Sequence, residues 1–175
     1  MTSNTFFIGD FDDSMEYKLL EIRHAISEQA SLSNGKIELI ICSEGGYAGY
    51  AWALVDLMER AKLAGVTVVT VVSGEAFSCG SVVAVAGSPG HRYIGHNAEH
   101  LVHLGSVSSH VTTDMQHSRQ AAYTKRHFNR VLNHYRKYAN IPDLEESLAD
   151  DNLFVPAARA KSWSMADQWI DKLPL

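Results

Sequence analysis

A serine and a histidine supply the residue types that acyl transfer needs. Ser78 lies in the Gly-rich segment 74–81, GEAFSCGS, between an apolar stretch that predicts a strand and a small-residue stretch that predicts a helix. A serine on such a turn can project its hydroxyl out of the backbone, while the next N–H points at a bound carbonyl. The segment lacks the G-x-S-x-G pattern of α/β-hydrolases, so on its own it indicates an ordinary turn or cap serine.

His103, in the apolar segment LVHLG, is the second candidate. Apolar surroundings favour a neutral imidazole, which can accept a proton as a general base. Taken alone, the same pattern is more typical of a histidine packed in the core. Ser78 and His103 therefore need further motifs before they become a catalytic hypothesis.

Two other arrangements of reactive side chains are alternatives. The spacing His96-x₃-His100-x₂-His103 is compatible with a metal site, but Glu99 is the nearest acid and no persuasive ligand set results, so no metal is expected. Cys79 is an alternative nucleophile, but nothing in its turn is basic enough to lower the pKa of the thiol. Four more histidines are expected on a solvated helix face and its approach: His110, His117, His127 and His134.

The elements that must position these residues alternate between strand and helix. Strands are predicted at 5–8, 36–43, 66–72, 92–94 and 99–104. Helices are predicted at 13–29, with a capping-box-like start at 13–16, and at 47–64, 82–86 and 115–138, with shorter ones beginning near Pro142 and Pro156. Uninterrupted apolar strands separated by helices indicate a parallel sheet covered by helices.

Length and charge limit the classes of function. The chain has 175 residues, 46% of them hydrophobic and 20% charged, which is typical of one globular domain with a buried core. Its 15 Lys and Arg against 20 Asp and Glu give a net charge of −5, so neither nucleic acid nor a membrane is an expected partner. Without a signal-like N-terminus, and with only Cys42 and Cys79 as cysteines, a soluble cytoplasmic protein is expected.

Four ordered motifs resemble those of one family. FFIGDFDDSM is similar to I-x-L-x-G-x-I-D-D-x-M, and ICSEGGYAGYAWALVDLME to I-N-S-P-G-G-x-x-x-x-G-x-x-I-x-D-x-M. GEAFSCGSVVAVAG resembles G-x-A-A-S-M-G-x-x-x-x-x-A-G, and HRYIGHNAEHLVHLGS resembles K-R-x-x-x-P-N-x-x-x-M-I-H-Q-P. The family is the Clp protease proteolytic subunit, serine peptidases of the crotonase-like superfamily, and the resemblance runs from about Phe6 to Asp167. It implies an α/β, crotonase-like spiral of βαβ units with a protruding strand-helix handle.

The resemblance implies a role for each matching residue. Ser78 falls on the nucleophile and His103 on the general base, with a spacing that needs no gap. The backbone N–H groups of Gly46 and Cys79 fall on the oxyanion hole, where only the backbone is needed. No cofactor is implied.

The substrate is expected to bind in the same region. An extended peptide would be added as a strand between the edge at Gly46–Tyr47 and the residues after His103. The expected substrate-binding positions are therefore Gly45, Tyr47 and Leu104.

The third position of the triad departs from the family. The late family motif D-x-F-[ML]-[ST]-A-x-E-A-x-x-x-G-[LI]-[IV]-D fits residues 152–167 without gaps and places Asn152 at the triad Asp. An Asn oxygen can accept the N–H of His103 but cannot stabilise the imidazolium by charge, and the same change in another serine protease lowers kcat about 10⁴-fold. Asp151 is the alternative, although adjacent side chains in an extended segment point opposite ways. A weakened peptidase is expected.

Assembly and organisation also follow from the resemblance. One domain, 1–175, would comprise a head core over about 6–104, a handle over about 105–140 and C-terminal head helices over about 141–175. The implied partners are peptide or unfolded protein, further copies in a heptamer of one or two rings, and an AAA+ unfoldase or another Clp subunit. Asp151 replaces the Arg expected at the contact between rings, and few residues precede Phe6, where members carry an axial segment.

The expected function is that of an ATP-dependent Clp protease proteolytic subunit, a serine endopeptidase that hydrolyses unfolded proteins inside an oligomeric ring. The alternative is a weakly active or inactive homologue that modulates or joins another Clp ring. Asn152, Asp151 and the short N-terminus favour this alternative, whereas Ser78 and His103 favour the enzyme. An acyl-CoA enzyme of the same superfamily would leave these two residues without a purpose.

Overall fold

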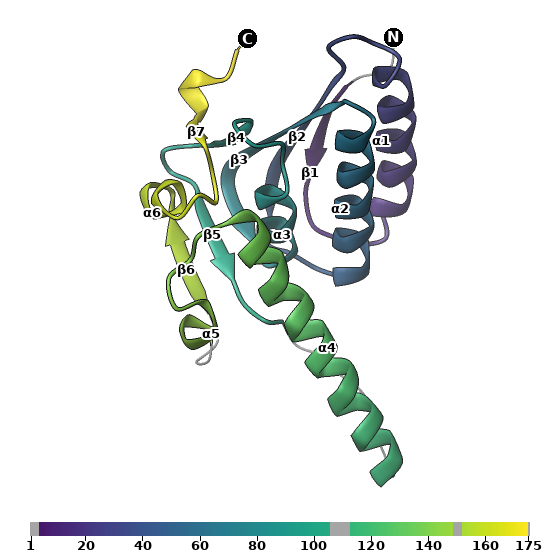
Figure 1. Ribbon diagram of the computed structural model, residues 1–175, viewed down its shortest axis with the longest axis vertical. Helices are drawn as coiled ribbons and strands as arrows, with labels where there is room; N and C mark the ends of the chain where they lie inside the picture. The colour runs from purple at the N-terminus through teal and green to yellow at the C-terminus, as the bar shows by residue number, and fades with distance from the viewer. Residues whose placement is uncertain (1–3, 106–112, 149–151, 175) are drawn as a thin grey trace.

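The computed structural model describes residues 4–105, 113–148 and 152–174. The strands are β1 (Thr5–Ile8), β2 (Lys36–Ser43), β3 (Thr67–Phe77), β4 (Arg92–Ile94), β5 (Glu99–Val102), β6 (Leu153–Pro156) and β7 (Gln168–Trp169). The helices are α1 (Met15–Gln29), α2 (Ala48–Leu63), α3 (Cys79–Val85), α4 (Asp114–Tyr138), α5 (Leu144–Ser147) and α6 (Ala157–Ser162), followed by the 3-10 turn η1 (Ile170–Lys172). The predicted α/β class is confirmed (Figure 1).

The sheet is mostly parallel and divides at β3. Its main order is β1-β2-β3-β4-β7, and every pair along this path is parallel. The first half of β3, at 70–72, pairs with β4, whereas the second half, at 75–77, pairs with β5. β6 then joins β5 in the antiparallel sense. The carboxyl end of β3 is thereby directed away from the main sheet and toward β5.

Both faces of β3 are covered, which explains its continuous apolar sequence. Val68 and Val72 belong to the main core with the helices, while Val69 and Val71 pack on the opposite face. This opposite face is covered by Ile170 and neighbouring residues at the carboxyl end of the described chain. Strand side chains alternate between faces, so a strand buried on both sides shows no polar alternation.

Several predicted boundaries differ from the structure. The segment 74–77, predicted as part of a turn, continues β3, and the strand predicted to reach residue 104 ends at Val102. β6 and β7 were not predicted, because each forms by pairing with a strand much earlier in the chain, β6 with β5 and β7 with β4. The predicted capping box at 13–16 is wrong, since the N-cap Ser14 makes no side-chain cap. A capping box at Thr113 instead begins α4.

The long helix α4 extends away from the sheet (Figure 1). Only its last third is anchored in the core, through Val131, Leu132 and Tyr135. His134, predicted on a solvated face, is also buried there, and its Nε2–H donates to the Val82 carbonyl of α3 at 2.8 Å. No helix in the described part of the chain is long and apolar enough to cross a membrane.

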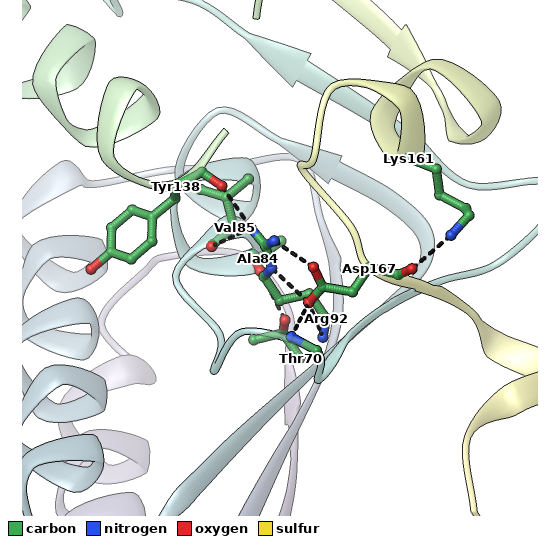
Figure 2. A network of polar contacts seen from close by, with 8 residues as sticks. Thr70, Ala84, Val85, Arg92, Tyr138, Lys161 and Asp167 are labelled. Atoms are coloured by element: carbon green, nitrogen blue, oxygen red, sulfur yellow. Dashed lines mark hydrogen bonds and ion pairs between the residues drawn. The ribbon is translucent and has the colours of Figure 1, made fainter. Parts of the chain in front are cut away.

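A bidentate ion pair ties the C-terminal segment to this core (Figure 2). Arg92 of β4 donates to both carboxylate oxygens of Asp167, from Nε at 2.9 Å and Nη2 at 2.5 Å. Its Nη1 also donates to the carbonyl of Tyr138, the last residue of α4, at 2.7 Å. Burial tends to raise the pKa of Asp167, but the hydrogen bonds and charge of Arg92 outweigh it and lower that pKa. One side chain therefore joins β4, the end of α4 and the approach to β7.

A second polar cluster lies inside the core, behind the first turn of α3. The Ser81 hydroxyl accepts the Tyr135 hydroxyl proton at 2.9 Å and lies 3.0 Å from Nδ1 of His100. His100 is completely buried, and its Nε2 has no hydrogen-bond partner among the described residues. Burial lowers the pKa of His100 to about 4. The imidazole is therefore neutral in the folded protein near pH 7.

This buried histidine predicts a loss of stability in acid. The unfolded chain binds a proton on His100 below about pH 6.5, whereas the folded chain does so only near pH 4. The contribution of neutral His100 to the free energy of unfolding is therefore fully present above about pH 6.5. It falls as the pH drops toward 4, by at most about 1.4 kcal/mol per pH unit for this group. We expect His100→Leu to flatten the pH dependence of urea unfolding between these values. Curves parallel to those of the unmodified protein, or an equal effect of His24→Leu at an exposed histidine of α1, would contradict this.

Candidate active site

Ser78 lies on a sharp turn that joins β3 to α3. Its φ is +52°, a value that only a small fraction of non-glycine residues adopt. Its N–H donates to the Leu101 carbonyl of β5 at 2.9 Å, which continues the β3–β5 pairing by one residue. The turn releases the serine side chain from the sheet immediately after the last paired position, and Cys79 begins the helix. This geometry corresponds to a nucleophile that projects from a sharp turn at the end of a strand.

Two glycines lie directly against this turn. Gly45 and Gly46 have φ values of +119° and +131°, which strain any residue with a side chain. A Cβ on Gly45 would lie 2.8 Å from the Cβ of Ser78, and a Cβ on Gly46 would lie 2.5 Å from the Phe11 carbonyl oxygen. The glycine pair is therefore required both by its conformation and by the close approach of Ser78 and Phe11.

Polar contacts hold the glycine pair, and sequence analysis did not identify them. The Asp10 carboxylate accepts the Glu44 N–H at 2.8 Å and the Ser43 hydroxyl at 3.3 Å. The Ser43 oxygen accepts the Gly45 N–H at 3.1 Å. Asp10 is part of the motif that resembles the family's first strand, but nothing in a linear pattern indicates that its partner lies 34 residues later.

His103 is brought to Ser78 by the same strand pairing. Phe77 of β3 lies opposite Leu101 of β5, so Ser78 and His103, which follow the ends of these two strands, lie at the same edge of the sheet. Nε2 of His103 is 2.6 Å from Oγ of Ser78. Such a contact allows the imidazole to remove the hydroxyl proton as the oxygen attacks. The two residues that we predicted from separate motifs are in hydrogen-bond contact.

The candidates for the third position lie at the entrance to β6. Val102 pairs with Leu153 in the antiparallel ladder, so the register places Asn152 across from His103. Opposed residues in such a ladder share a face of the sheet. The Asn152 side chain is exposed and forms no hydrogen bond to another described residue. Asp151 lies outside the described residues, and the group that orients His103 stays a prediction.

The two residues predicted for the oxyanion hole are neighbours in space. The Sγ of Cys79 lies 3.3 Å from the carbonyl oxygen of Gly46. No described residue accepts a hydrogen bond from the backbone N–H of either residue. Burial raises the pKa of the Cys79 thiol to about 11. A thiol with so high a pKa is a poor nucleophile at neutral pH, which disfavours Cys79 as the attacking residue.

A cleft of about 500 Å³ opens beside Ser78 and His103. Of the predicted substrate positions, Tyr47 and Leu104 line this cleft, whereas Gly45 instead supports Ser78. The Leu104 carbonyl also accepts the Nε2–H of His127 at 3.1 Å. An open cleft beside the serine leaves room for an extended chain at the reacting hydroxyl.

The far wall of the cleft comes from residues that sequence analysis did not place there. Trp52 of α2 and Tyr123, His127 and Arg130 of α4 all line it. Their spacing along α4, at i, i+4 and i+7, is the signature of one helix face. The sequence shows that face but not which part of the molecule it meets.

The three closely spaced histidines do not converge. His103 contacts Ser78, and His100 contacts Ser81 in the core. His96 is stacked on the Trp169 ring with centroids 4.5 Å apart. Among the residues that the structure describes, no group of three His, Cys, Asp or Glu side chains is arranged to hold a metal ion.

Comparison with known proteins agrees with this geometry. The chain matches the Clp protease family over residues 5–172. It is 30% identical over 136 residues to the ATP-dependent Clp protease proteolytic subunit 1 of Chlamydia pneumoniae, with 75% of this chain and 68% of the relative covered. The resemblance seen in the four motifs is confirmed. The chain belongs to the Clp protease family and is a serine-type peptidase.

Proposed function

We propose that this protein hydrolyses peptide bonds of unfolded proteins, with Ser78 as the nucleophile and His103 as the general base. The contact of 2.6 Å between Ser78 Oγ and His103 Nε2, at the edge of an open cleft, is the observation that supports this assignment best. The intact pair also favours an active enzyme over a silent homologue. The roles of the remaining residues follow from where each lies around this pair.

The chemistry proceeds by acyl transfer. Ser78 Oγ attacks the substrate carbonyl while its proton moves to His103 Nε2, and the carbonyl oxygen becomes an oxyanion. The backbone N–H groups of Gly46 and Cys79 donate to that oxyanion. His103 then gives its proton to the leaving amine, so that an acyl-serine ester and a free amino terminus result. Water, activated by the same imidazole, hydrolyses the ester and regenerates the serine.

The substrate lies in the cleft as an added strand. Tyr47 and Leu104 both line the cleft, and the backbone at each is the partner that we propose for the substrate main chain. Pairing through the main chain makes binding tolerant of sequence, which suits an enzyme for unfolded chains. Specificity is then left to the side chains that line the cleft.

Assembly is the second part of the proposal. The relative in Chlamydia pneumoniae is by its name a subunit of an ATP-dependent protease. By analogy, this chain acts as one subunit of a ring of seven, in one or two rings, with a Clp ATPase that delivers unfolded protein. Much of α4 lies outside the core of the single chain, which leaves it free for contacts between copies.

Replacing the nucleophile is the first test of the catalytic assignment. Ser78→Ala is expected to reduce hydrolysis of a fluorogenic peptide to background, because loss of the attacking serine in a comparable protease lowers kcat about 10⁶-fold. Labelling by a serine-directed phosphonate is also lost, as measured by mass spectrometry. The control Ser27→Ala, at an exposed serine of α1, keeps both. Labelling that persists in Ser78→Ala contradicts the assignment.

The third position is tested by restoring a carboxylate. With Asn152 opposite His103, Asn152→Asp adds a negative charge that stabilises the imidazolium, and we expect kcat to rise by at least about tenfold within the range known for this group. Asp151→Asn serves as the comparison and leaves kcat within about twofold of the unmodified protein. If Asn152→Asp has no effect while Asp151→Asn abolishes turnover, Asp151 is the residue that orients His103.

The proposed ring assembly is tested by measuring the molecular mass of the protein in solution. Light scattering at micromolar concentration is expected to give a ring of seven copies or two such rings. A monomer under these conditions contradicts the proposed assembly without affecting the assignment of Ser78.

A further inference from the structure

We propose that the cleft beside Ser78 selects substrates with an acidic side chain, Asp or Glu, at the residue whose carbonyl is attacked, and that Arg130 is the residue that recognises it. This inference rests on the proposed peptidase function and names the substrate class of the same site. Three observations carry it: the position of Arg130, the lack of an ion pair between Arg130 and any acid that the structure describes, and the charges of the described residues around the cleft.

The first observation is position. Arg130 lines the same cleft as Ser78 and His103, on the face of α4 that also carries Tyr123 and His127. It directly precedes Val131, which is buried in the core. The turn of helix that carries Arg130 is therefore fixed relative to the serine, although the earlier part of α4 is largely exposed.

The second observation is that the Arg130 guanidinium is held in place, while no acidic side chain in the described part of the chain neutralises it. Its central carbon lies 4.2 Å from the centroid of the Trp52 ring, over which it stacks. Stacking orients the planar donor group while its N–H groups stay available for a carboxylate. Arg130 forms no ion pair with any described residue. Farther along the same helix, Arg136 pairs with Glu145 and Lys137 with Glu59.

The third observation is the charge of the walls. The described residues that line the cleft include no Asp or Glu, and Arg130 is the one side chain among them that is charged at every relevant pH. Two histidines, His103 and His127, share the cleft and already interact with Ser78 and Leu104. An acidic substrate side chain thus meets a planar donor of opposite charge, whereas a Lys or Arg side chain meets a like charge.

The size of the cleft agrees with an acidic substrate side chain. The cleft of about 500 Å³ is bordered by the rings of Tyr47, Trp52 and Tyr123, which contact the methylene groups of a Glu side chain. The carboxylate can then accept two parallel N–H bonds from the guanidinium, the geometry in which Arg discriminates best between a carboxylate and an amide. The corresponding amide, Gln, offers one acceptor and no charge.

The test is a set of fluorogenic peptides that differ only at the residue before the scissile bond: Glu, Gln, Leu or Lys. For the unmodified protein we expect kcat/KM for the Glu peptide to exceed that for the Gln peptide by about tenfold or more, the effect of one hydrogen bond to a charged group. Arg130→Met is expected to bring the ratio of Glu to Gln hydrolysis close to one, and hydrolysis of the Leu peptide by the same variant serves as its internal reference. Arg130→Lys keeps the positive charge, and we expect it to retain part of the preference for the Glu peptide.

A matched control separates the local charge from the overall charge. Arg119→Met removes the same charge from an exposed position of α4 that does not line the cleft, and the ratio of Glu to Gln hydrolysis stays as in the unmodified protein. A ratio near one in the unmodified protein, or a ratio that Arg130→Met leaves unchanged while the Leu peptide is cleaved, overturns the inference but not the peptidase function.

Binding gives a readout that does not depend on turnover. If no peptide is cleaved, the peptidase function fails, and the affinity of Ser78→Ala protein for the labelled Glu and Gln peptides still tests the subsite. Tighter binding of the Glu peptide that is lost in Ser78→Ala, Arg130→Met supports recognition by Arg130. Equal binding of the two peptides contradicts it.

Discussion

The positive φ of Ser78 is the constraint on which the site depends. Such a conformation costs a residue with a side chain about 1 to 3 kcal/mol, so the surrounding structure must determine it. Two features do so here. The Ser78 N–H is fixed by the Leu101 carbonyl, and the backbone of Gly45 comes so close to the serine that no side chain fits between them. The strained turn, the division of the sheet at β3 and the glycine pair are thus parts of one arrangement.

The sequence predicts the elements that have a strong local pattern. β2 begins and ends at the predicted residues, 36 and 43, because a short stretch rich in aliphatic and β-branched residues and bounded by glycines admits few alternatives. β6 is different, since it forms only when residues near 155 return to pair with β5 about fifty positions earlier. The stretch 74–77 was predicted as a turn because of its glycine, yet β5 supplies the pairing that keeps it extended. β2 could be predicted from its local sequence, whereas β6 and residues 74–77 depend on pairing with distant strands, which no short stretch of sequence reveals.

The same distinction applies to the site. Ser78 and His103 were predictable because each lies in its own motif and the sheet brings the two motifs together. The cleft wall made by Trp52 and Arg130 was not predictable from the sequence. It forms only because α4 packs with one particular rotation about its own axis. His134 shows that this rotation could not be inferred from residue type. It was predicted on a solvated face because it is polar, yet it is buried and hydrogen-bonded to the Val82 carbonyl of α3.

That rotation is set by a small number of buried groups. Tyr135 donates to Ser81 and His134 to the carbonyl of Val82, so both polar contacts from this turn of α4 are made to α3. α3 is also the helix that begins immediately after Ser78. Because a buried donor without an acceptor is costly, these bonds exclude other rotations of α4 more strongly than apolar packing alone. The helix that follows the nucleophile therefore also determines which face of α4, and which charge, the cleft presents to a substrate.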